Sequence, residues 1–445
     1  DLDTLGGPNS FVEVAGDLPG VLNNRETVVG CADTSFADPS FPEFSPLLSP
    51  PAPDPFIFHS FRWNKGRMTD LGALPGHNSS CATWISRNGL ISGISSIAAF
   101  DPALGGLAAH AVFWRDDEII DIGTFGGAES LALGVNDHGQ VAGSATNTIP
   151  DSVSGFGTQL RAFRWQNGVM QDLGTLGGPD AFATSINDSG QVAGCANTDL
   201  VNQDAFLWED GNMIDLGSFG GSYACAFQVN NHGQVMGLST LAGDQVQHAF
   251  IGDRRGIRDL GDFGGSVVEP LWLNEKGEVV GKATYPGDEI AHAFFWRNGV
   301  MTDLGTLYPT CASSGSVALG ANSNEQIVGN SWCDDMAAGF LWKNGGPMID
   351  LNTLKPSDSP MYLFGAQNIN DRGEISGLGF LPKSGEIHAF LLVPCGEDST
   401  VCREKTESPI GEARPRVVLP ESIKVMLRKK RQHPFHILNL RTPKS

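Results

Sequence analysis

The chain has 445 residues, of which 40% are apolar and 18% are charged, and it contains 56 glycines and 26 prolines. This composition indicates a globular protein of many short strands and tight turns, and it excludes a largely disordered chain or one dominated by long helices. The formal charge of −21 disfavours nucleic acid and anionic membranes as partners, and the chain lacks the run of about 18 apolar residues that would span a bilayer.

The same phrase recurs eight times along residues 1–393, and its clearest copy is MQDLGTLGGPDAFATSINDSGQVAGCANTDLVNQDAFLW at residues 170–208. After a first interval of 69 residues, the spacing between the aspartates that open the phrase lies between 43 and 51 residues. Periods of this size are typical of solenoids, propellers and arrays. The opening aspartates are Asp1, Asp70, Asp121, Asp172, Asp215, Asp259, Asp303 and Asp350.

Each copy contains four short strand signals that are separated by turn residues. In the fourth copy we expect strands at 181–187, 191–194, 205–208 and 213–219, with a hairpin turn at 187–190. In this turn the asparagine can hydrogen-bond to its own backbone, and the glycine can adopt a positive φ. Four antiparallel strands in a unit of this length predict one blade of a β-propeller.

The eight copies therefore predict an all-β domain at residues 1–393, a closed β-propeller with eight blades, or with seven if the first or last copy is incomplete. The chain opens on a fourth-strand phrase at 1–7, partway through a repeat, so it is expected to be processed or a fragment. The last copy ends on a third-strand phrase at 388–392, so the N-terminal strand is expected to complete the last blade. An open β-solenoid, the alternative, does not explain these complementary ends.

Residues 394–445 are predicted to form a largely disordered tail. From residue 396 onward the tail carries 11 basic and 6 acidic residues, which leaves 18 basic and 44 acidic residues in the preceding part of the chain. A tail of this charge can fold back onto the acidic domain.

Three repeated motifs carry a resemblance to a known family. They are His-Ala-Phe-x-Trp at 292–296, Asp-Leu-Gly-Thr-Leu-Gly-Gly at 172–178 and Ile-Asn-x-x-Gly-Gln-Val-x-Gly at 186–194. Because the three motifs recur in order, residues 1–393 resemble the HAF-repeat family of extracellular bacterial proteins. The resemblance implies an exported repeat protein and supplies no catalytic residues.

Residues that recur in most copies are expected to be structural. We expect each opening aspartate to accept backbone N–H groups of the turn that follows it. A histidine of the third strand is expected to bond within its own unit, because Arg161, Asp204 and Ala338 replace it in three copies and so exclude a symmetric metal ring. An irregular metal site that uses two of these histidines is the alternative.

Six tryptophans at one position of the third strand are expected to pack between units, with a sugar platform as the alternative. The repeated histidines are His59, His110, His248, His292 and His388, and the tryptophans are Trp63, Trp114, Trp165, Trp208, Trp296 and Trp342. No catalytic constellation, phosphate-binding loop or calcium loop is evident in the sequence. We therefore assign no catalytic, metal-binding or cofactor-binding residues and favour a binding protein over an enzyme.

Eight cysteines predict disulfides and hence an oxidising compartment, so the protein is expected to be secreted, extracellular or periplasmic. Two pairs occupy equivalent repeat positions in consecutive units, and two pairs are local. Unpaired core cysteines are the alternative. The predicted pairs are Cys31–Cys81, Cys195–Cys225, Cys311–Cys333 and Cys395–Cys402.

Departures from the repeat are where we expect binding. The loop between the second and third strands is long in the first three copies, at 31–57, 94–109 and 144–160, and these loops would share one face. Neutral drift in tolerant loops is the alternative. We predict an exported, monomeric, non-catalytic binding protein that recognises an extracellular protein or glycan through these loops. The alternatives are a hydrolase or lyase that acts on polysaccharide at the mouth of the central channel, and a structural cell-surface array.

Overall fold

The computed structural model describes residues 1–12, 20–41, 45–48, 55–76, 79–116, 118–395 and 419–432. In this described part the protein is all-β, with thirty-one strands, two short 3-10 helices and one α-helix. The strands form eight consecutive antiparallel units, numbered one to eight here, of which the first seven have four strands and the eighth has three. Units four and five share one sheet through a single parallel pair, Gln203 opposite Tyr223.

Units one to four contain β1 (Gly6–Phe11), β2 (Thr27–Ala37), β3 (Phe56–Asn64) and β4 (Arg67–Gly72); β5 (Ser80–Ile85), β6 (Ile91–Asp101), β7 (Gly106–Arg115) and β8 (Glu118–Asp121); β9 (Gly126–Val135), β10 (Val141–Pro150), β11 (Thr158–Gln166) and β12 (Val169–Asp172); and β13 (Ala181–Ile186), β14 (Val192–Asn197), β15 (Gln203–Glu209) and β16 (Asn212–Gly217). Units five to eight contain β17 (Gly220–Val229), β18 (Val235–Leu241), β19 (Gln247–Asp253) and β20 (Gly256–Asp259); β21 (Val268–Leu273), β22 (Val279–Thr284), β23 (Ala291–Arg297) and β24 (Val300–Asp303); β25 (Gly315–Ala321), β26 (Gln326–Cys333), β27 (Met336–Lys343) and β28 (Ile349–Asp350); and β29 (Tyr362–Ile369), β30 (Ile375–Phe380) and β31 (Ile387–Leu392). The helices are η1 (Pro46–Leu48), η2 (Leu351–Thr353) and α1 (Glu421–Gln432).

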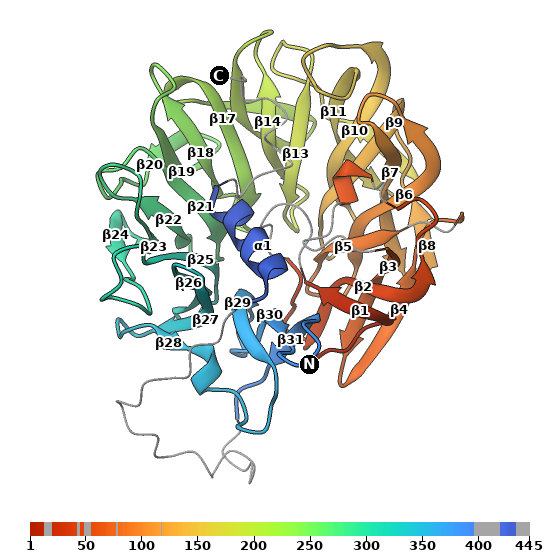
Figure 1. The fold of residues 1–445 in the computed structure, drawn as a ribbon. Coiled ribbons are helices and arrows are strands. Elements are labelled where there is room, and N and C mark those ends of the chain that lie inside the picture. The colour runs from red at the N-terminus through yellow and green to blue at the C-terminus, as the bar shows by residue number, and fades with distance from the viewer. Residues whose placement is uncertain are drawn as a thin grey trace.

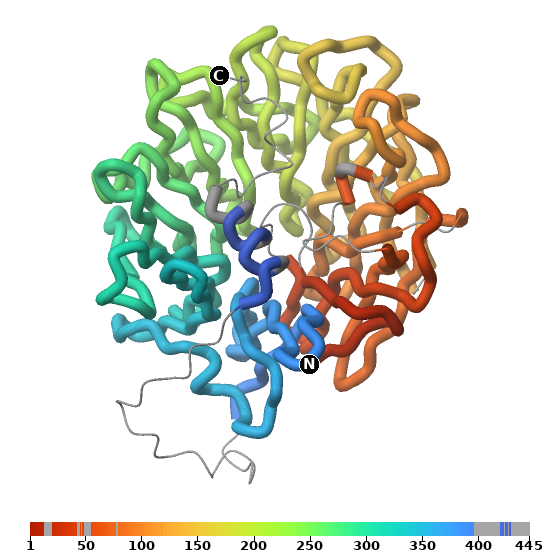
Figure 2. The backbone as a smooth tube through the Cα atoms, viewed as in Figure 1, coloured from red at the N-terminus to blue at the C-terminus, as the bar shows by residue number. Residues whose placement is uncertain are grey.

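The units are arranged around a common centre (Figure 1). From red to blue, each unit follows its neighbour around the molecule, and the last unit lies beside the first (Figure 2). Leu2 donates its N–H to the carbonyl of Ala389 in β31 at 2.9 Å, as Leu304 does to Ala293 within unit six. The N-terminal residues thus lie beside β31 as the fourth strand lies beside the third in other units.

A phenylalanine and a glycine that face each other form the repeated core of the units. Phe206 of β15 is fully buried, and a Cβ added to Gly194 of β14 would lie 2.8 Å from its ring and 2.0 Å from the carbonyl oxygen of Phe182. Only glycine fits at this position. In unit two the equivalent residue is Val112, which lies opposite Gly93 and is also fully buried. In the other units the equivalent residues are phenylalanines that are at most 2% exposed, namely Phe61, Phe163, Phe250, Phe294, Phe340 and Phe390.

The predicted long loops are partly strands. Residues 94–109 are a hairpin extension of β6 and β7, with Phe100 opposite Leu107 and Asp101 opposite Gly106. In unit three Pro150 pairs with Thr158, and in unit one Ala37 pairs with Phe56. The loop prediction was wrong for these residues because pairing in the extended ladder satisfies backbone groups that a loop would leave to solvent. Residues 42–44 and 49–54 lie outside the described part.

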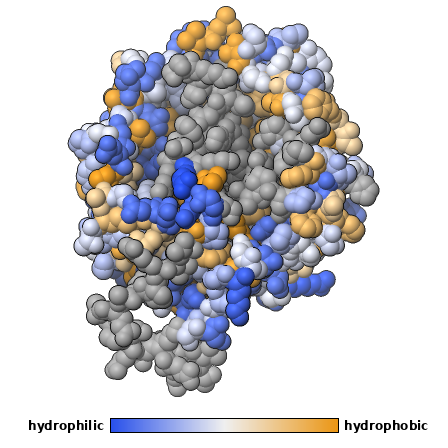
Figure 3. All heavy atoms as spheres, viewed as in Figure 1, coloured by the Kyte–Doolittle hydropathy of each residue, from blue (hydrophilic) through white to orange (hydrophobic). Residues whose placement is uncertain are grey.

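The tail contains a helix that the sequence analysis did not predict. Leu419, Ile423 and Leu427 are 2%, 0% and 7% exposed and belong to the same apolar cluster as the inner strands. Helix α1 lies across the centre of the molecule in Figure 1, where Figure 3 shows blue hydrophilic atoms beside a small orange patch, and Val425 of the helix is 42% exposed. Among the described residues, no helix has the length and apolar character needed to cross a membrane. Residues 396–418 and 433–445 lie outside the described part, so disorder there stays a prediction.

Candidate active site

In seven of the eight units, the turn before the second strand carries an asparagine that links neighbouring units. Asn187 donates from Nδ2 to the carbonyl of Asn230 at 2.8 Å, and its Oδ1 accepts the N–H of Gln191 at 3.0 Å. Asn370 of unit eight donates in the same way to the carbonyl of Asn23 in unit one, at 2.9 Å. The other asparagines that donate to the next unit are Asn23, Asn136, Asn230, Asn274 and Asn322. These bonds fix the turns around the central channel.

The residue after this asparagine, or after Ser86 in unit two, lines the mouth of the channel, and we call these eight residues the rim. The rim is held by bonds between units: Asp137 donates its N–H to Asp188 Oδ1 at 3.0 Å, and Ser323 donates its N–H to Asp371 Oδ1 at 2.9 Å. Although the eight positions are equivalent in the repeat, they hold four carboxylates and one guanidinium. The rim consists of Asn24, Arg87, Asp137, Asp188, Asn231, Glu275, Ser323 and Asp371.

Arg87 neutralises one side of the rim. Its Nε lies 3.2 Å from Asp137 Oδ2, and its terminal nitrogen forms an ion pair with Asp188. Burial lowers the pKa of Arg87, but the charges of Asp188, Asp137 and Glu275 outweigh burial and raise the pKa above its usual value.

Glu275 and Asp371 lie on the other side of the rim. Glu275 accepts the N–H and the Nδ2 of Asn231 at 3.0 and 2.9 Å, and Asp371 accepts Asn24 Nδ2 at 3.0 Å. Burial raises the pKa of Asp371, but the hydrogen bonds from Ser323 and Asn24 outweigh it, so that its pKa lies below the ordinary value. Within the described residues, Arg87 is the one Lys or Arg whose nitrogen lies within 4.0 Å of a rim carboxylate.

Behind the rim lies a cavity of about 220 Å³. The residues one step before the asparagines form its apolar wall, for example Ile85, Val135 and Ile186. One residue deeper, Trp84 of β5 and Trp272 of β21 stack with ring centroids 6.4 Å apart and an interplanar angle of 25°. Since these tryptophans come from units two and six, four units apart, they meet across the channel.

The residues predicted from the repeats lie away from this cavity, in the third and fourth strands. Asp172 accepts the N–H of Gly174 at 2.9 Å, which is the turn contact expected of the opening aspartate. The other seven aspartates accept the N–H two residues onward at 2.7 to 2.9 Å, and they are Asp1, Asp70, Asp121, Asp215, Asp259, Asp303 and Asp350.

The repeated histidines bond to the same aspartates. His292 Nδ1 lies 3.0 Å from Asp303, and Arg161 forms an ion pair of 3.0 Å with Asp172 where the histidine is replaced. The other four histidines make the same contact at 2.7 to 3.1 Å, in the pairs His59–Asp70, His110–Asp121, His248–Asp259 and His388–Asp1. Five equivalent contacts agree with the predicted structural role.

Five of the six repeated tryptophans are at most 7% exposed, and they are Trp114, Trp165, Trp208, Trp296 and Trp342. Trp63 is partly buried and packs against the core. Trp114 donates from Nε1 to the carbonyl of Leu71 in unit one at 2.9 Å, and Trp165 lies 5.5 Å from Phe113 of the preceding unit. They pack between units as expected, and a sugar platform at this position does not fit their burial.

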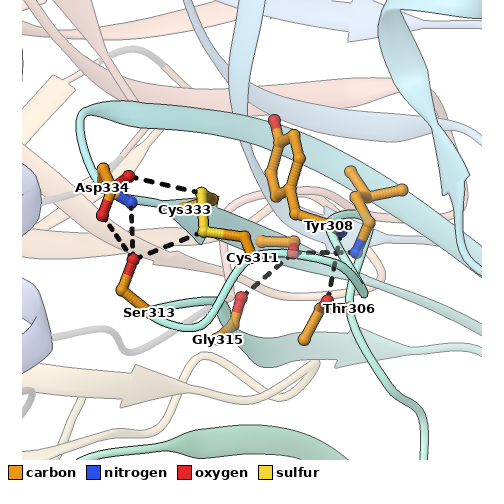
Figure 4. Close-up of a disulfide and its surroundings, with 9 residues drawn as sticks. Thr306, Tyr308, Cys311, Ser313, Gly315, Cys333 and Asp334 are labelled. Atoms are coloured by element: carbon orange, nitrogen blue, oxygen red, sulfur yellow. Dashed lines mark hydrogen bonds between the residues drawn. A yellow bond between two sulfur atoms is a disulfide. The ribbon is translucent and has the colours of Figure 1, made fainter.

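Three of the predicted disulfides are present, namely Cys31–Cys81, Cys195–Cys225 and Cys311–Cys333. Of the fourth predicted pair, Cys395–Cys402, Cys402 lies outside the described residues. Figure 4 shows Cys311 and Cys333 beside Ser313 and Asp334. In the described part of the chain, Cys311, Cys333 and Asp334 are the one group of three potential metal ligands within 4.8 Å of one another. Because both sulfurs are in the disulfide, the group offers no thiolate to a metal.

The rim and the two channel tryptophans were missed in the sequence, where the turns were interpreted only as hairpins. The signal was available at two aligned positions. When the copies are aligned on the turn asparagine, Arg87 is the one basic residue at a position that otherwise holds Asp, Glu, Asn and Ser. Trp84 and Trp272 stand at a position that otherwise holds Val, Gly, Ser, Gln and Asn.

No family model matches the chain, and no curated protein matches its sequence. Solved structures match at low identity. A prolyl endopeptidase matches with 10% identity and a TM-score of 0.48, over 87% of this chain and 51% of that one. A puromycin-hydrolyzing peptidase from Mycobacterium tuberculosis matches with 10% identity and a TM-score of 0.42, over 68% and 49%.

The β-propeller domain of the Trilobed protease from Pyrococcus furiosus matches with 7% identity and a TM-score of 0.44, over 70% of this chain and 92% of that one. This chain spans about half the length of the two peptidases above. Because these matched structures belong to peptidases and proteases, they contradict the prediction of a non-catalytic binding protein, which we set aside. The hydrolase alternative is argued below from this chain's own residues.

Proposed function

We propose that the protein is a hydrolase that cleaves a neutral polysaccharide at the mouth of the central channel. The observation that carries the proposal is the asymmetry of the rim. A position with a purely structural role would repeat, as the turn asparagines and the His–Asp pairs do. Four carboxylates and one guanidinium above a cavity are instead the groups that acid–base hydrolysis of a glycosidic bond requires.

The rim assigns a role to each charged residue. Asp137 and Asp188 are engaged in ion pairs with Arg87, so the catalytic roles fall to the other two rim carboxyl groups. Asp371, whose pKa is lowered, is the base or nucleophile, and Glu275 is the carboxyl that protonates the leaving oxygen. With Asp371 as the base, Asp371 takes one proton of a water while the hydroxyl of that water joins the anomeric carbon. The glycosidic C–O bond breaks and the leaving oxygen takes the proton of Glu275, and the proton on Asp371 then returns to Glu275 through solvent. A uronic acid polymer is disfavoured, since it would bring negative charge to a rim on which the carboxyl groups outnumber the one guanidinium.

The scaffold is proposed to be a closed propeller of eight blades. Three observations support closure: the bond from Leu2 to Ala389, the contact between His388 and Asp1, and the asparagine bond from unit eight to unit one. The three disulfides support export to an oxidising compartment. Membership of the HAF-repeat family and a monomeric state remain proposals that rest on the sequence.

The test is turnover of a panel of neutral polysaccharides by the purified full chain, measured as released reducing ends. Glu275→Gln and Asp371→Asn are nearly isosteric and are expected to lower kcat roughly 10²- to 10⁴-fold. The matched control is Asp253→Asn, an exposed carboxylate 2.6 Å from Arg255 and outside the rim, which is expected to leave kcat unchanged. The proposal is overturned by the absence of turnover on every substrate, or by turnover that both rim substitutions leave intact.

A further inference from the structure

The channel cavity has a built floor. Trp272 donates from Nε1 to the carbonyl of Ala321 at 2.8 Å, which holds its ring in place. A Cβ added to Gly20 would lie 2.2 Å from the ring of Trp84, so the glycine allows this ring to pack closely. The equivalent positions of three other units hold the small residues Gly134, Ser185 and Gly320.

This floor makes the cavity blind. Trp84 stands three residues before Arg87 on one continuous stretch, which places the stacked rings roughly 10 Å behind the rim along a strand. The two rings meet across the channel, and helix α1 covers the centre on the opposite side of the molecule from the turns. A long polymer therefore cannot thread through the channel, and only the end of a chain can enter it.

The size and lining of the cavity select what enters. A volume of about 220 Å³ is below the ~300–1,000 Å³ that is typical of pockets for drug-sized ligands, so it suits a single small ring. The wall is apolar and the floor is aromatic, and a sugar ring presents apolar C–H groups to such a face while its hydroxyls remain near a polar rim. With the ring in the cavity, its bond to the next unit faces the rim that carries Glu275 and Asp371.

We infer that the cavity is a subsite for one terminal neutral sugar ring, which stacks on Trp84 and Trp272, so that the enzyme releases single units from chain ends. The inference rests on the proposed function. It adds that the substrate is the end of a neutral chain and that Trp84 and Trp272 select this end.

The experiment follows the products from neutral oligosaccharides labelled at one end. The expected first product is the monosaccharide, with the oligosaccharide shortened one unit at a time, and capping of the chain end is expected to stop the reaction. Trp84→Ala is expected to raise KM roughly 2- to 10-fold through lost stacking, and Trp84→Phe to restore most of the loss. Trp63→Phe, which changes a tryptophan outside the channel, serves as the control.

A second measurement separates this inference from the proposed function. Quenching of tryptophan fluorescence by the monosaccharide is measured in the Glu275→Gln variant, with and without Trp84→Phe. Hydrolysis that yields internal fragments, or that ignores Trp84→Ala, overturns the inference and leaves the proposed function standing. Binding that depends on Trp84, without turnover on any substrate, supports the subsite and overturns the hydrolase. If the protein shows no binding of the monosaccharide and no turnover of any substrate, both the inference and the proposed function are overturned.

Discussion

The two ends of the central channel are built from different parts of the same repeat. On the turn face, each unit contributes a turn of fixed length, and the units differ mainly in the rim residue. On the opposite face, which we call the loop face, the units differ in length: β6 and β7 extend as a hairpin, and the hairpin between β26 and β27 carries Asp335, which pairs with Lys424 of α1 at 3.2 Å. On the turn face, the units differ in residue type at one position, and this difference places charged groups on the rim. On the loop face, the units differ in hairpin length, and the longer hairpins cover that end of the channel.

This contrast predicts that the loop face contributes stability and the turn face contributes chemistry. The turn asparagines form hydrogen bonds of 2.8 to 3.4 Å to the carbonyl oxygens of the next unit. These bonds hold the rim residues in fixed positions, which is the preorganisation that catalysis needs. On the loop face a disulfide, a docked helix and a buried acid pair close the ends of the strands. The predictions below therefore combine a change on one face with a measurement that reports on the other.

The largest effect on stability is expected from the disulfide of the loop face. Replacing Cys311 and Cys333 by Ser opens a loop with a sequence separation of 22, which is expected to cost about 3 kcal/mol in the free energy of unfolding. Denaturant titration measures the loss. If kcat falls along with stability, the separation of the two faces fails.

Helix α1 is expected to be removable without loss of turnover. Ile423→Asp places a charge at a fully buried position and is expected to release the helix, with a loss of about 2–3 kcal/mol of unfolding free energy. Hydrogen exchange of the α1 amides and kcat are both measured, and Val425→Asp, at a position 42% exposed, is the control. Equal effects of the two substitutions, or a changed kcat, would contradict the docked-cover interpretation.

Arg87→Met tests the turn face. The substitution leaves Asp137 and Asp188 adjacent and without their cation, so the rim is expected to lose order and kcat/KM to fall about 10- to 100-fold. The thermal midpoint is expected to change little, because the side chain of Arg87 is 60% exposed. A variant that unfolds instead of losing activity would place Arg87 among the structural residues.

A smaller, pH-dependent effect is expected from Glu129 on the loop face. Burial raises the pKa of Glu129 to about 8 although the N–H of Ala109 opposes the rise, and the hydrogen bond with Asp101 adds to it. The folded protein holds this proton more tightly than the unfolded chain, whose value is 4.5, so the stabilisation is complete below pH 4.5 and is lost as the pH rises through about 8.

The slope from this one group is at most about 1.4 kcal/mol per pH unit. Glu129→Gln keeps an acceptor for Ala109 and is expected to remove that slope, as measured by the free energy of unfolding at several pH values between 5 and 9. If the free energy of unfolding depends on pH in the same way in the wild type and in the variant, Glu129 does not retain its proton.

Much of the scaffold could be predicted from the sequence, because each unit repeats the same local physics. The turn contacts of the aspartates, the burial of the tryptophans and the register of the disulfides were expected from positions that recur, whereas the aspartate partner of each repeated histidine was not. Helix α1 was missed although Leu419, Ile423 and Leu427 are spaced four apart, since the basic run after Leu427 drew the interpretation toward a solvated tail. The strand extensions were missed because insertions in repeats are usually loops.

The candidate site could not be predicted in the same way. Its residues lie in eight turns that are far apart in the chain, and some, for instance Arg87 and Glu275, occur at their position in one unit alone. Only the arrangement of the units around one centre brings these residues together. The stacked tryptophans are 188 residues apart, from Trp84 to Trp272, and no local pattern joins them. Repeated residues predict the scaffold, whereas the proposed site is made of residues that differ between units.

The most direct test of the central claim is a crystal structure of the Asp371→Asn variant with a neutral oligosaccharide that the wild-type protein hydrolyses. We expect one terminal ring in the channel cavity against Trp84 and Trp272, with the glycosidic oxygen within hydrogen-bond distance of Glu275. Sugar bound on the loop face, with the channel cavity empty, would contradict the account.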